Sequence, residues 1–298
     1  MATLQDIKRR IRSVGNTRKV TKALELVASA RLRRAEERIV EMRDYADRMQ
    51  ELTAGTARAA SSLRGLTLLQ EREPRRVAIV ALTGDRGLAG PFNGQILRRA
   101  FALERSLRSE SREVRWLVVG RKGRSTLRFR RYEVEQAWVG FTDRPGYHDA
   151  QAVAHRLAEL YTQDVIDRAV LVYNHYVSPL VQRVTEQQVL PISEEVLGRE
   201  QEEDPEHERA LVGDFIYEPE PEQILERLLP VYLETEVYRA LLESAASEHG
   251  ARMTAMRNAS KNAVELIDSL TLDLNRARQA EITQEILEVV AGADALTQ

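Results

Sequence analysis

Apolar residues near the N-terminus recur at intervals of three and four, which is the spacing of a coiled-coil seam. Three sets have this spacing: Leu4, Ile7, Ile11, Val14; then Val20, Leu24, Val27; then Ala35, Ile39, Met42, Ala46, Met49. Because the sets do not share one phase, we expect an irregular supercoil. Thr3 followed by Asp6 is typical of a helix start and predicts a helix over about residues 3 to 56.

The C-terminal part of the chain has a longer and more regular apolar pattern. Its seam positions are Leu242, Ala246, His249, Met253, Met256, Ser260, Ala263, Ile267, Leu270, Leu274 and Ala277. Five heptads in one phase predict a coiled-coil helix from Pro230 to about Ala291, with Gly292 as its C-cap. Neither long helix is hydrophobic enough to stand alone, so we expect the two to pair antiparallel.

The middle of the chain alternates between strand-like and helix-like patterns. The predicted strands cover residues 76–82, 114–120 and 169–173, with edge strands at 136–141 and 181–190, and the predicted helices cover 91–108 and 148–163. This alternation indicates βαβ units and a mostly parallel sheet. The predicted fold is therefore a Rossmann-like α/β domain inserted between the two helices of a long antiparallel coiled coil.

The predicted domain bounds follow from this order of elements. Residues 1–72 form the N-terminal coiled-coil helix, 73–213 the central α/β domain, and 214–298 the C-terminal helix that pairs with 1–72. An acidic stretch at residues 194–213 contains Gly and Pro and is interpreted as a loop of the central domain.

Charge is placed unevenly along a chain of 298 residues whose formal net charge is only −2. Residues 1–34 hold ten Lys or Arg and two acids, whereas residues 194–208 hold eight acids and one Arg. The basic segment has no aromatic residue before Tyr45, which argues against nucleic-acid binding and against a membrane-surface helix. We therefore expect it to face acidic protein partners.

Composition excludes several classes of site. The chain has no cysteine, so disulfides, thiolate catalysis and Cys-based zinc sites are excluded. No apolar run reaches the length of about 20 residues that spans a bilayer, so no membrane insertion is expected. No signal or transit segment is recognisable at the N-terminus.

The turn Thr83–Gly90 follows the first predicted strand and precedes a helix, where Rossmann-like domains bind phosphate. Its spacing matches neither G-x-G-x-x-G nor the P-loop, so a structural turn is the favoured interpretation over nucleotide binding. His148 and His155 are seven residues apart, but no third metal ligand is in register. We expect no catalytic residue, no metal and no cofactor.

Three stretches resemble the gamma subunit of F-type ATP synthases. They are "IKRRIRSVGNTRKVTKALELVASARLRR" at residues 7–34, "TGDRGLAGPFN" at 83–93, and the stretch from "YRALLESAASEHG" to "EILEVVAGADAL" at 238–296. The resemblance weakens between about residues 120 and 215. It implies a rotor shaft of a bacterial proton-translocating ATP synthase, a peripheral, non-catalytic subunit on the cytoplasmic face of the plasma (inner) membrane.

The resemblance also implies partners: three alpha and three beta subunits, the epsilon subunit and the c-subunit ring of the membrane. Residues that match family positions near the beta subunits are Arg278, Gln279 and Thr283 at the C-terminal end and Lys8, Arg9, Lys19, Lys22 and Leu24 at the N-terminal end. Phe215, Tyr217 and Glu218 match the segment that leads to the membrane ring. Two alternatives remain open, a coiled-coil scaffold protein with a non-catalytic α/β module, and a nucleotide-binding α/β protein using residues 83–91.

Overall fold

The structure is a computed structural model that describes residues 3–60, 62–63, 65–193 and 218–296. The chain divides into two compact units. Unit 1 comprises Met1–Ser29 and Arg252–Gln298, and unit 2 comprises Ala30–Ala251. Two long helices, α1 (Leu4–Ala59) and α6 (Pro221–Leu296), each contribute residues to both units.

The start of α1 has the predicted cap. The Asp6 carboxylate accepts hydrogen bonds from the Thr3 backbone N–H at 3.2 Å and the Thr3 hydroxyl at 2.8 Å, and the Asp6 N–H donates to the Thr3 hydroxyl at 3.3 Å. These bonds satisfy donors that the first turn of a helix leaves without intrahelical partners. The predicted helix over residues 3 to 56 is thus confirmed, with an end at Ala59.

The predicted bounds of the C-terminal helix were wrong at both ends. Helix α6 begins at Pro221 and has Pro230 in its interior. Leu225 and Leu229 are both buried in the core of unit 2, and this packing offsets the cost of about 3 kcal/mol of an interior proline. Gly292 is not a C-cap, because the helix continues to Leu296.

Unit 2 contains a five-stranded sheet of order β3-β2-β1-β4-β5. The strands are β1 (Arg76–Leu82), β2 (Glu113–Val119), β3 (Val134–Trp138), β4 (Arg168–Ser178) and β5 (Val181–Leu190). The first four are parallel, and β5 pairs antiparallel with β4 at one edge. All predicted strands and the mostly parallel sheet are confirmed; β1 and β5 have the predicted bounds.

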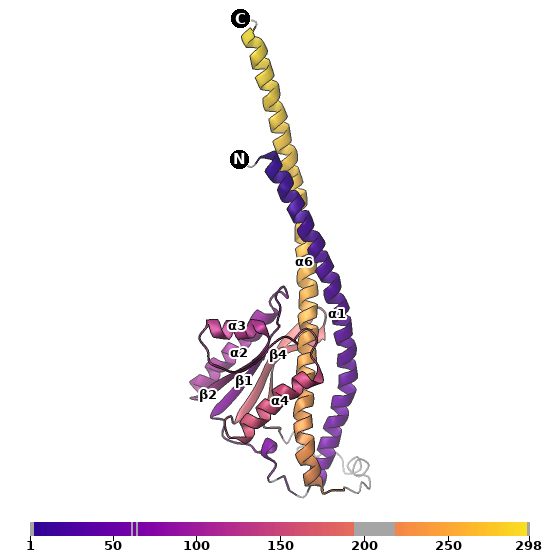
Figure 1. Ribbon diagram of the computed structural model, residues 1–298, viewed down its shortest axis with the longest axis vertical. Helices are drawn as coiled ribbons and strands as arrows, with labels where there is room; N and C mark the ends of the chain where they lie inside the picture. The colour runs from indigo at the N-terminus through magenta and orange to yellow at the C-terminus, as the bar shows by residue number, and fades with distance from the viewer. Residues whose placement is uncertain (1–2, 61, 64, 194–217, 297–298) are drawn as a thin grey trace. The chain divides into compact units, whose positions relative to one another are not determined.

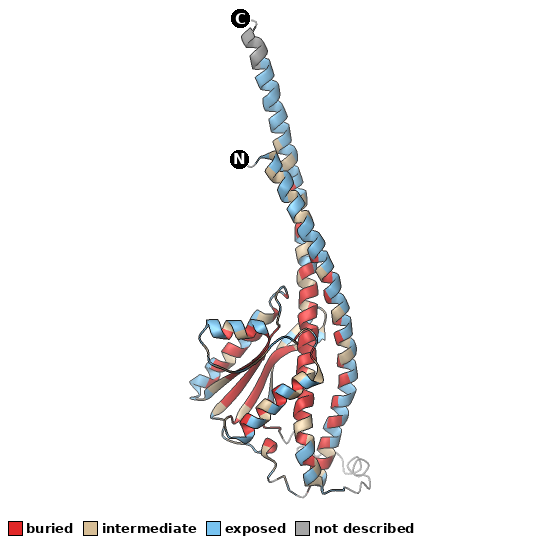
Figure 2. Cartoon of the chain, viewed as in Figure 1, coloured by how far each residue is buried: buried red, intermediate tan, exposed pale blue. Residues whose placement is uncertain are grey.

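Helices cover both faces of this sheet (Figures 1 and 2). Strand β1 shows why: Val77, Ile79 and Ala81 pack on one face with α2 (Phe92–Ser109) and α3 (Arg121–Phe129). The intervening residues 78, 80 and 82 pack on the other face with η1 (Thr67–Leu69), α4 (Tyr147–Thr162) and the unit 2 segments of α1 and α6. Alternation along a strand thus gives each face its own apolar layer. Helix α3 was not predicted, because its short sequence is mostly basic and polar.

A buried carboxylate joins the first residues of β1 and β4. Asp167 accepts hydrogen bonds from the Arg76 guanidinium at 2.7 and 3.2 Å and from the backbone N–H groups of Arg75 and Arg76 at 3.1 and 2.8 Å. Burial raises the pKa of Asp167, but the hydrogen bonds from Arg76 and Arg75 outweigh burial and leave the pKa below its usual value. The parallel pairing of β1 with β4 therefore begins at a satisfied ionic contact.

Unit 1 consists of two antiparallel helical segments with a narrow buried seam. Its buried residues from α6 include Met253, Met256, Ala263 and Leu270. The other predicted seam positions of this segment, Ser260, Ile267, Leu274 and Ala277, are half-buried. The C-terminal heptad pattern is confirmed, and the residues from Arg278 to Val290 are exposed.

The predicted N-terminal seam was wrong in its middle set. Val20 and Val27 are 59% and 49% exposed, and Leu24 is half-buried. The buried residues are instead Thr21, Glu25 and Ala28. From Val14, steps of four and three lead through residues 18, 21, 25 and 28 into unit 2. There they continue through six buried residues: Leu32, Ala35, Ile39, Met42, Ala46 and Met49. The first and third apolar sets therefore share one phase, and the expected phase break does not occur.

Candidate partner-binding surfaces

The basic N-terminal segment has two different sides in unit 1. The inner side carries Thr21, Glu25 and Ala28, which are buried. The outer side carries Val20 and Val27, with Leu24 half-buried between them, at the spacing that had suggested a seam. Val20 and Val27 are largely exposed and lie off the seam of the paired helices. They indicate a surface for another protein.

Glu25 is the ionic centre of this inner side. Its carboxylate is hydrogen-bonded to the Lys22 ammonium at 3.0 Å and to the Arg257 guanidinium at 3.1 Å. The hydrogen bond from Lys22 lowers the pKa of Glu25; burial opposes this shift, and the bond from Arg257 adds to it. Because Glu25 lies on α1 and Arg257 on α6, this contact fixes the pairing of the two helices within unit 1.

The predicted basic contact residues lie on the surface. Lys8, Arg9, Lys19 and Lys22 are all exposed. Arg9 pairs with Asp6 at 2.7 Å, and Lys22 has the bond to Glu25. Lys22 therefore has a structural role in addition to the predicted partner contact. Leu24 is half-buried beside the basic residues.

The C-terminal tip, which we define as residues 278–290 of α6, lies beyond the last seam position and is exposed (Figure 2). It contains the predicted contact residues Arg278, Gln279 and Thr283. The Thr283 hydroxyl donates to the carbonyl of Gln279 at 2.9 Å, so it is anchored to its own helix. The tip also carries exposed large apolar residues: Ile282, Ile286, Leu287, Val289 and Val290, which are 45% to 72% exposed. So many exposed apolar side chains on one short segment indicate a protein interface.

The three residues predicted near the membrane ring are only partly described. Phe215 and Tyr217 lie outside the described residues, as does the acidic segment 194–213. Glu218 is exposed and lies three residues before the start of α6. Their role stays a prediction.

The turn at residues 83–90 contains a carboxylate, that of Asp85, with several hydrogen-bond donors around it. The Asp85 carboxylate accepts hydrogen bonds from the backbone N–H groups of Arg121 at 2.9 Å and Gly140 at 2.8 Å, and from Thr142 at 3.1 and 3.2 Å. Arg121 is the first residue of α3, so Asp85 accepts a hydrogen bond from the N-terminus of α3, whereas the helix that follows the turn is α2. This arrangement supports the structural interpretation of the turn over nucleotide binding.

Close packing reinforces that interpretation. Gly120 has φ +96°, and a Cβ there would lie 2.1 Å from the Thr83 carbonyl oxygen. The Thr83 hydroxyl donates to the Val119 carbonyl at 2.8 Å and accepts from the Gly123 N–H at 2.9 Å. The ends of β1 and β2 are thus joined directly to α3.

The four described histidines lie next to acidic residues or backbone of the chain itself. His155 and His175 contact Glu234 and Glu243 at 2.8 and 2.5 Å, and His148 lies 3.2 Å from Asp149. His249, which is 2% exposed, lies 3.1 Å from the Asp143 carbonyl. His207 falls outside the described residues. No group of three or more potential metal ligands occurs within the described part of the chain.

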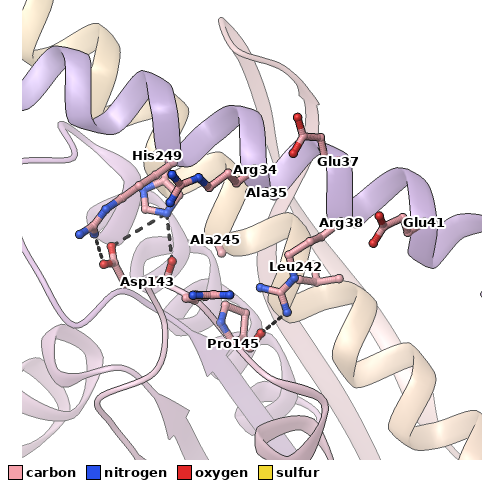
Figure 3. A pocket seen from close by; sticks show the side chains of 12 residues that line it. Arg34, Ala35, Glu37, Arg38, Glu41, Asp143, Pro145, Leu242, Ala245 and His249 are labelled. Atoms are coloured by element: carbon pink, nitrogen blue, oxygen red, sulfur yellow. Dashed lines mark hydrogen bonds and ion pairs between the residues drawn. The ribbon is translucent and has the colours of Figure 1, made fainter.

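A cavity of about 500 Å³ lies within unit 2, between α1, α6 and the loop at residues 143–145 (Figure 3). Asp143 pairs with Arg31 of α1 and contacts His249 of α6. Arg38 donates to the Pro145 carbonyl at 2.6 Å and to the Tyr238 hydroxyl at 2.7 Å. These contacts of Asp143 and Arg38 attach both helices to the α/β domain.

Sequence reasoning missed several of these residues. Thr21 and Glu25 were missed because polar side chains do not register in a search for apolar periodicity. The regular steps from Val14 to Leu32 were the available signal. The exposed apolar residues from Ile282 to Val290 were not predicted, because they lie within a stretch that was interpreted only as a family motif. Asp143 lies in a loop and carries no sequence signal.

Comparison with known proteins identifies relatives along the whole chain. A family model described as ATP synthase matches residues 3–296. The ATP synthase gamma chain of Rubrobacter xylanophilus is 47% identical over 296 residues, which cover 99% of both chains. That of Moorella thermoacetica is 44% identical, over 99% of this chain and 100% of its own.

Solved structures of ATP synthases also contain chains that resemble this one. A chain in the central stalk and c-ring structure of the Tetrahymena thermophila mitochondrial ATP synthase matches with a TM-score of 0.58 and 27% identity, over 81% of this chain and 99% of its own. A chain of the Euglena gracilis mitochondrial ATP synthase matches with a TM-score of 0.68, over 98% of this chain and 94% of its own; at 18% identity it shows the shared fold. Within the described residues, no helix is long and apolar enough to cross a membrane.

Proposed function

Because the chain belongs to the gamma-chain family of ATP synthases, we propose that it is the central rotor shaft of a bacterial F-type proton-translocating ATP synthase. Its two paired helices reach into a head of three alpha and three beta subunits. Its α/β domain faces the epsilon subunit and the c-subunit ring. The complex lies at the cytoplasmic face of the plasma (inner) membrane, with this chain as a peripheral subunit.

The observation that carries this proposal is the exposed apolar tip of α6. Ile282 and Ile286 lie one helical turn apart on a segment whose residues are all exposed in unit 1. The surrounding alpha and beta subunits bury these apolar side chains, which the chain itself leaves exposed to water. Arg278, Gln279 and Thr283 lie at the base of the same segment and contact the beta subunits there.

The basic segment of α1 supplies a second contact with the beta subunits. Lys8, Arg9, Lys19 and Lys22 present positive charge, and Leu24 lies among them. Acidic surfaces of the beta subunits are the complementary partners, and such contacts set orientation and rate of association more than affinity. We assign Phe215, Tyr217 and Glu218 to the contact with the membrane ring.

The functional division of the chain follows the bounds 1–72, 73–213 and 214–298, with helix, α/β domain and helix in turn. ATP chemistry takes place on the beta subunits, and we assign this chain neither a catalytic group nor a cofactor. The hydrogen bonds of Asp85 with Arg121, Gly140 and Thr142 support that assignment, since they give this turn a structural role.

Coupling follows from the asymmetry of the shaft. Three chemically identical beta subunits meet different sides of the two helices, so each contact favours a different conformation of its subunit. By linkage, a change in the conformations of the beta subunits changes the favoured orientation of the shaft. Rotation driven by the ring therefore redistributes open and closed states around the head.

Reconstitution with the alpha and beta subunits of the same organism tests this function. The wild-type chain should copurify at one copy to three of each partner, a ratio that the scaffold alternative does not predict. The double variant Ile282→Asp/Ile286→Asp should lose most of this assembly, because it places charge in the apolar contact. Val40→Asp is the matched control, since Val40 is 61% exposed on α1 in unit 2. Equal assembly of all three proteins would contradict the proposal.

A further inference from the structure

We propose that a groove along α3 binds an acidic peptide segment of a protein partner, with an apolar side chain of that segment against Phe129. The groove is a hollow of about 570 Å³ on the α/β domain. It is independent of the shaft function. Its principal lining side chains are Arg86, Arg121, Lys122, Ser125, Thr126 and Phe129.

The first argument is charge. Residues 121–131 include six Lys or Arg and no acid. Within the described part of the chain, the side chains of Arg121, Lys122 and Arg128 form no ion pair, although they are exposed. Asp85 also lines the hollow, but its carboxylate already accepts the bonds from Arg121 N–H, Gly140 and Thr142. Arg128 lies outside the lining, and Arg86, which does line the hollow, pairs with Asp143 at 4.0 Å. Arg121 and Lys122, unpaired within the described residues, therefore leave the hollow positive.

The second argument is the exposed aromatic ring. Phe129 is 87% exposed, whereas Leu127 on the same helix is fully buried. Lys122, Ser125, Thr126 and Phe129 have the spacing i, i+3, i+4 and i+7, which places them on one face of α3. The groove thus has cations at the N-terminal end of the helix and an apolar ring at its other end.

The hydroxyl groups between these ends suit a peptide. Ser125 donates to the Arg121 carbonyl at 2.8 Å and Thr126 donates to the Lys122 carbonyl at 2.9 Å. Their protons are therefore used inside the helix, and their lone pairs are available to accept backbone N–H groups. Arginine at one end provides bidentate recognition of a carboxylate.

The same features disfavour other anionic partners. A single-stranded nucleic acid is bound by several aromatic platforms along a basic groove, whereas this groove offers one ring. A membrane-surface helix buries a broad apolar face, whereas Phe129 is the only large apolar residue of α3 that is exposed.

The test measures binding to the full-length chain by fluorescence anisotropy. The probe is a fluorescein-labelled glutamate-rich peptide with one central phenylalanine, and the comparison probe has serine in place of that phenylalanine. Wild type should bind the first probe more tightly, and Arg121→Gln/Lys122→Gln should weaken that binding by about tenfold, the size of one strong ionic contact. Phe129→Ser should remove the preference between the two probes.

Arg98→Gln/Arg105→Gln is the matched control, because it removes the same charge from exposed positions of α2. Its binding should stay at the wild-type level. If the control variant weakened peptide binding equally, the peptide would be binding a diffuse basic surface, and the proposed groove site would be wrong. Failure of wild type to bind the phenylalanine probe, or tighter binding of an oligothymidine or of vesicles with anionic lipid, would overturn the acidic-peptide assignment. Circular dichroism of each variant verifies that the α/β domain is folded.

Discussion

The two units differ in how completely they bury their apolar residues. In unit 2, the sheet residues Ile79, Leu117 and Leu171 are fully buried between helical layers. In unit 1, Met253 and Leu270 remain 7% and 8% exposed in a narrow seam, and a fully exposed tip follows. Unit 2 has the interior of an independent domain, whereas unit 1 leaves a segment with many apolar residues exposed.

The difference shows that one helix can serve two purposes. Residues of α6 from Leu233 to Ala246 are mostly buried against the α/β core and against α1 within unit 2. Residues 278–290 are exposed despite an apolar content that would suit an interior. Burial within the chain stabilises the first segment, and we propose that the second is buried against partners.

The largest effect is expected from a cavity in the core of unit 2. Leu171→Ala should lower the free energy of unfolding by about 2–5 kcal/mol, because a fully buried side chain in the middle of β4 is removed. Urea unfolding followed by the fluorescence of the buried Trp116 measures this change. Leu180→Ala, at a position 73% exposed, is the control and should change stability by less than about 0.5 kcal/mol. Similar losses for both variants would contradict the contrast between interior and surface.

An intermediate effect is expected at the ionic centre of unit 1. Glu25→Gln should weaken the pairing of the helices by about 1 kcal/mol, a modest value because both cationic partners are half or more exposed. Since the pKa of Glu25 is lowered, its contribution is present above the usual value of 4.5 and is lost as pH falls through the lowered value.

Hydrogen exchange of residues 15–29 measures this pairing across pH. The variant should exchange faster than wild type near neutral pH, and the difference should shrink in acid. A difference that persists unchanged at the lowest pH would show that Glu25 acts through packing rather than charge.

The smallest effect on stability is expected on the outer side of α1. Val27→Thr should change the free energy of unfolding by less than about 0.5 kcal/mol, because Val27 is 49% exposed and lies off the seam. Ala28→Thr is the comparison, since Ala28 is 1% exposed and a larger side chain there separates the helices. Thermal unfolding monitored by circular dichroism distinguishes them. A greater loss of stability from Val27→Thr than from Ala28→Thr would show that Val27 lies in the seam, as first predicted.

Most of the fold could be predicted because local patterns and tertiary packing agree. Strand β1 is a continuous apolar run flanked by polar residues, and it is buried on both faces. The heptads from Leu242 to Ala277 keep one phase, so the buried stripe of α6 follows from sequence alone. Pro230 was misleading because tertiary contacts of Leu225 and Leu229 outweigh a local preference.

The contact surfaces were less predictable. The inner side of α1 uses a carboxylate, Glu25, whose partner Arg257 is far away in sequence, and periodicity of apolar residues cannot detect such a pair. The groove along α3 depends on the close approach of two chain segments, the turn at Arg86 and the helix at Lys122. Only the folded sheet brings those cations together.

The carboxylate of Asp85 has a consequence for how the molecule is made. Many α/β domains hold a nucleotide at the ends of their parallel strands and are incomplete without it. Here the chain encodes the negative group that joins α3 to the loop at Gly140 and Thr142. The link between α3 and that loop therefore forms through a carboxylate of the chain itself.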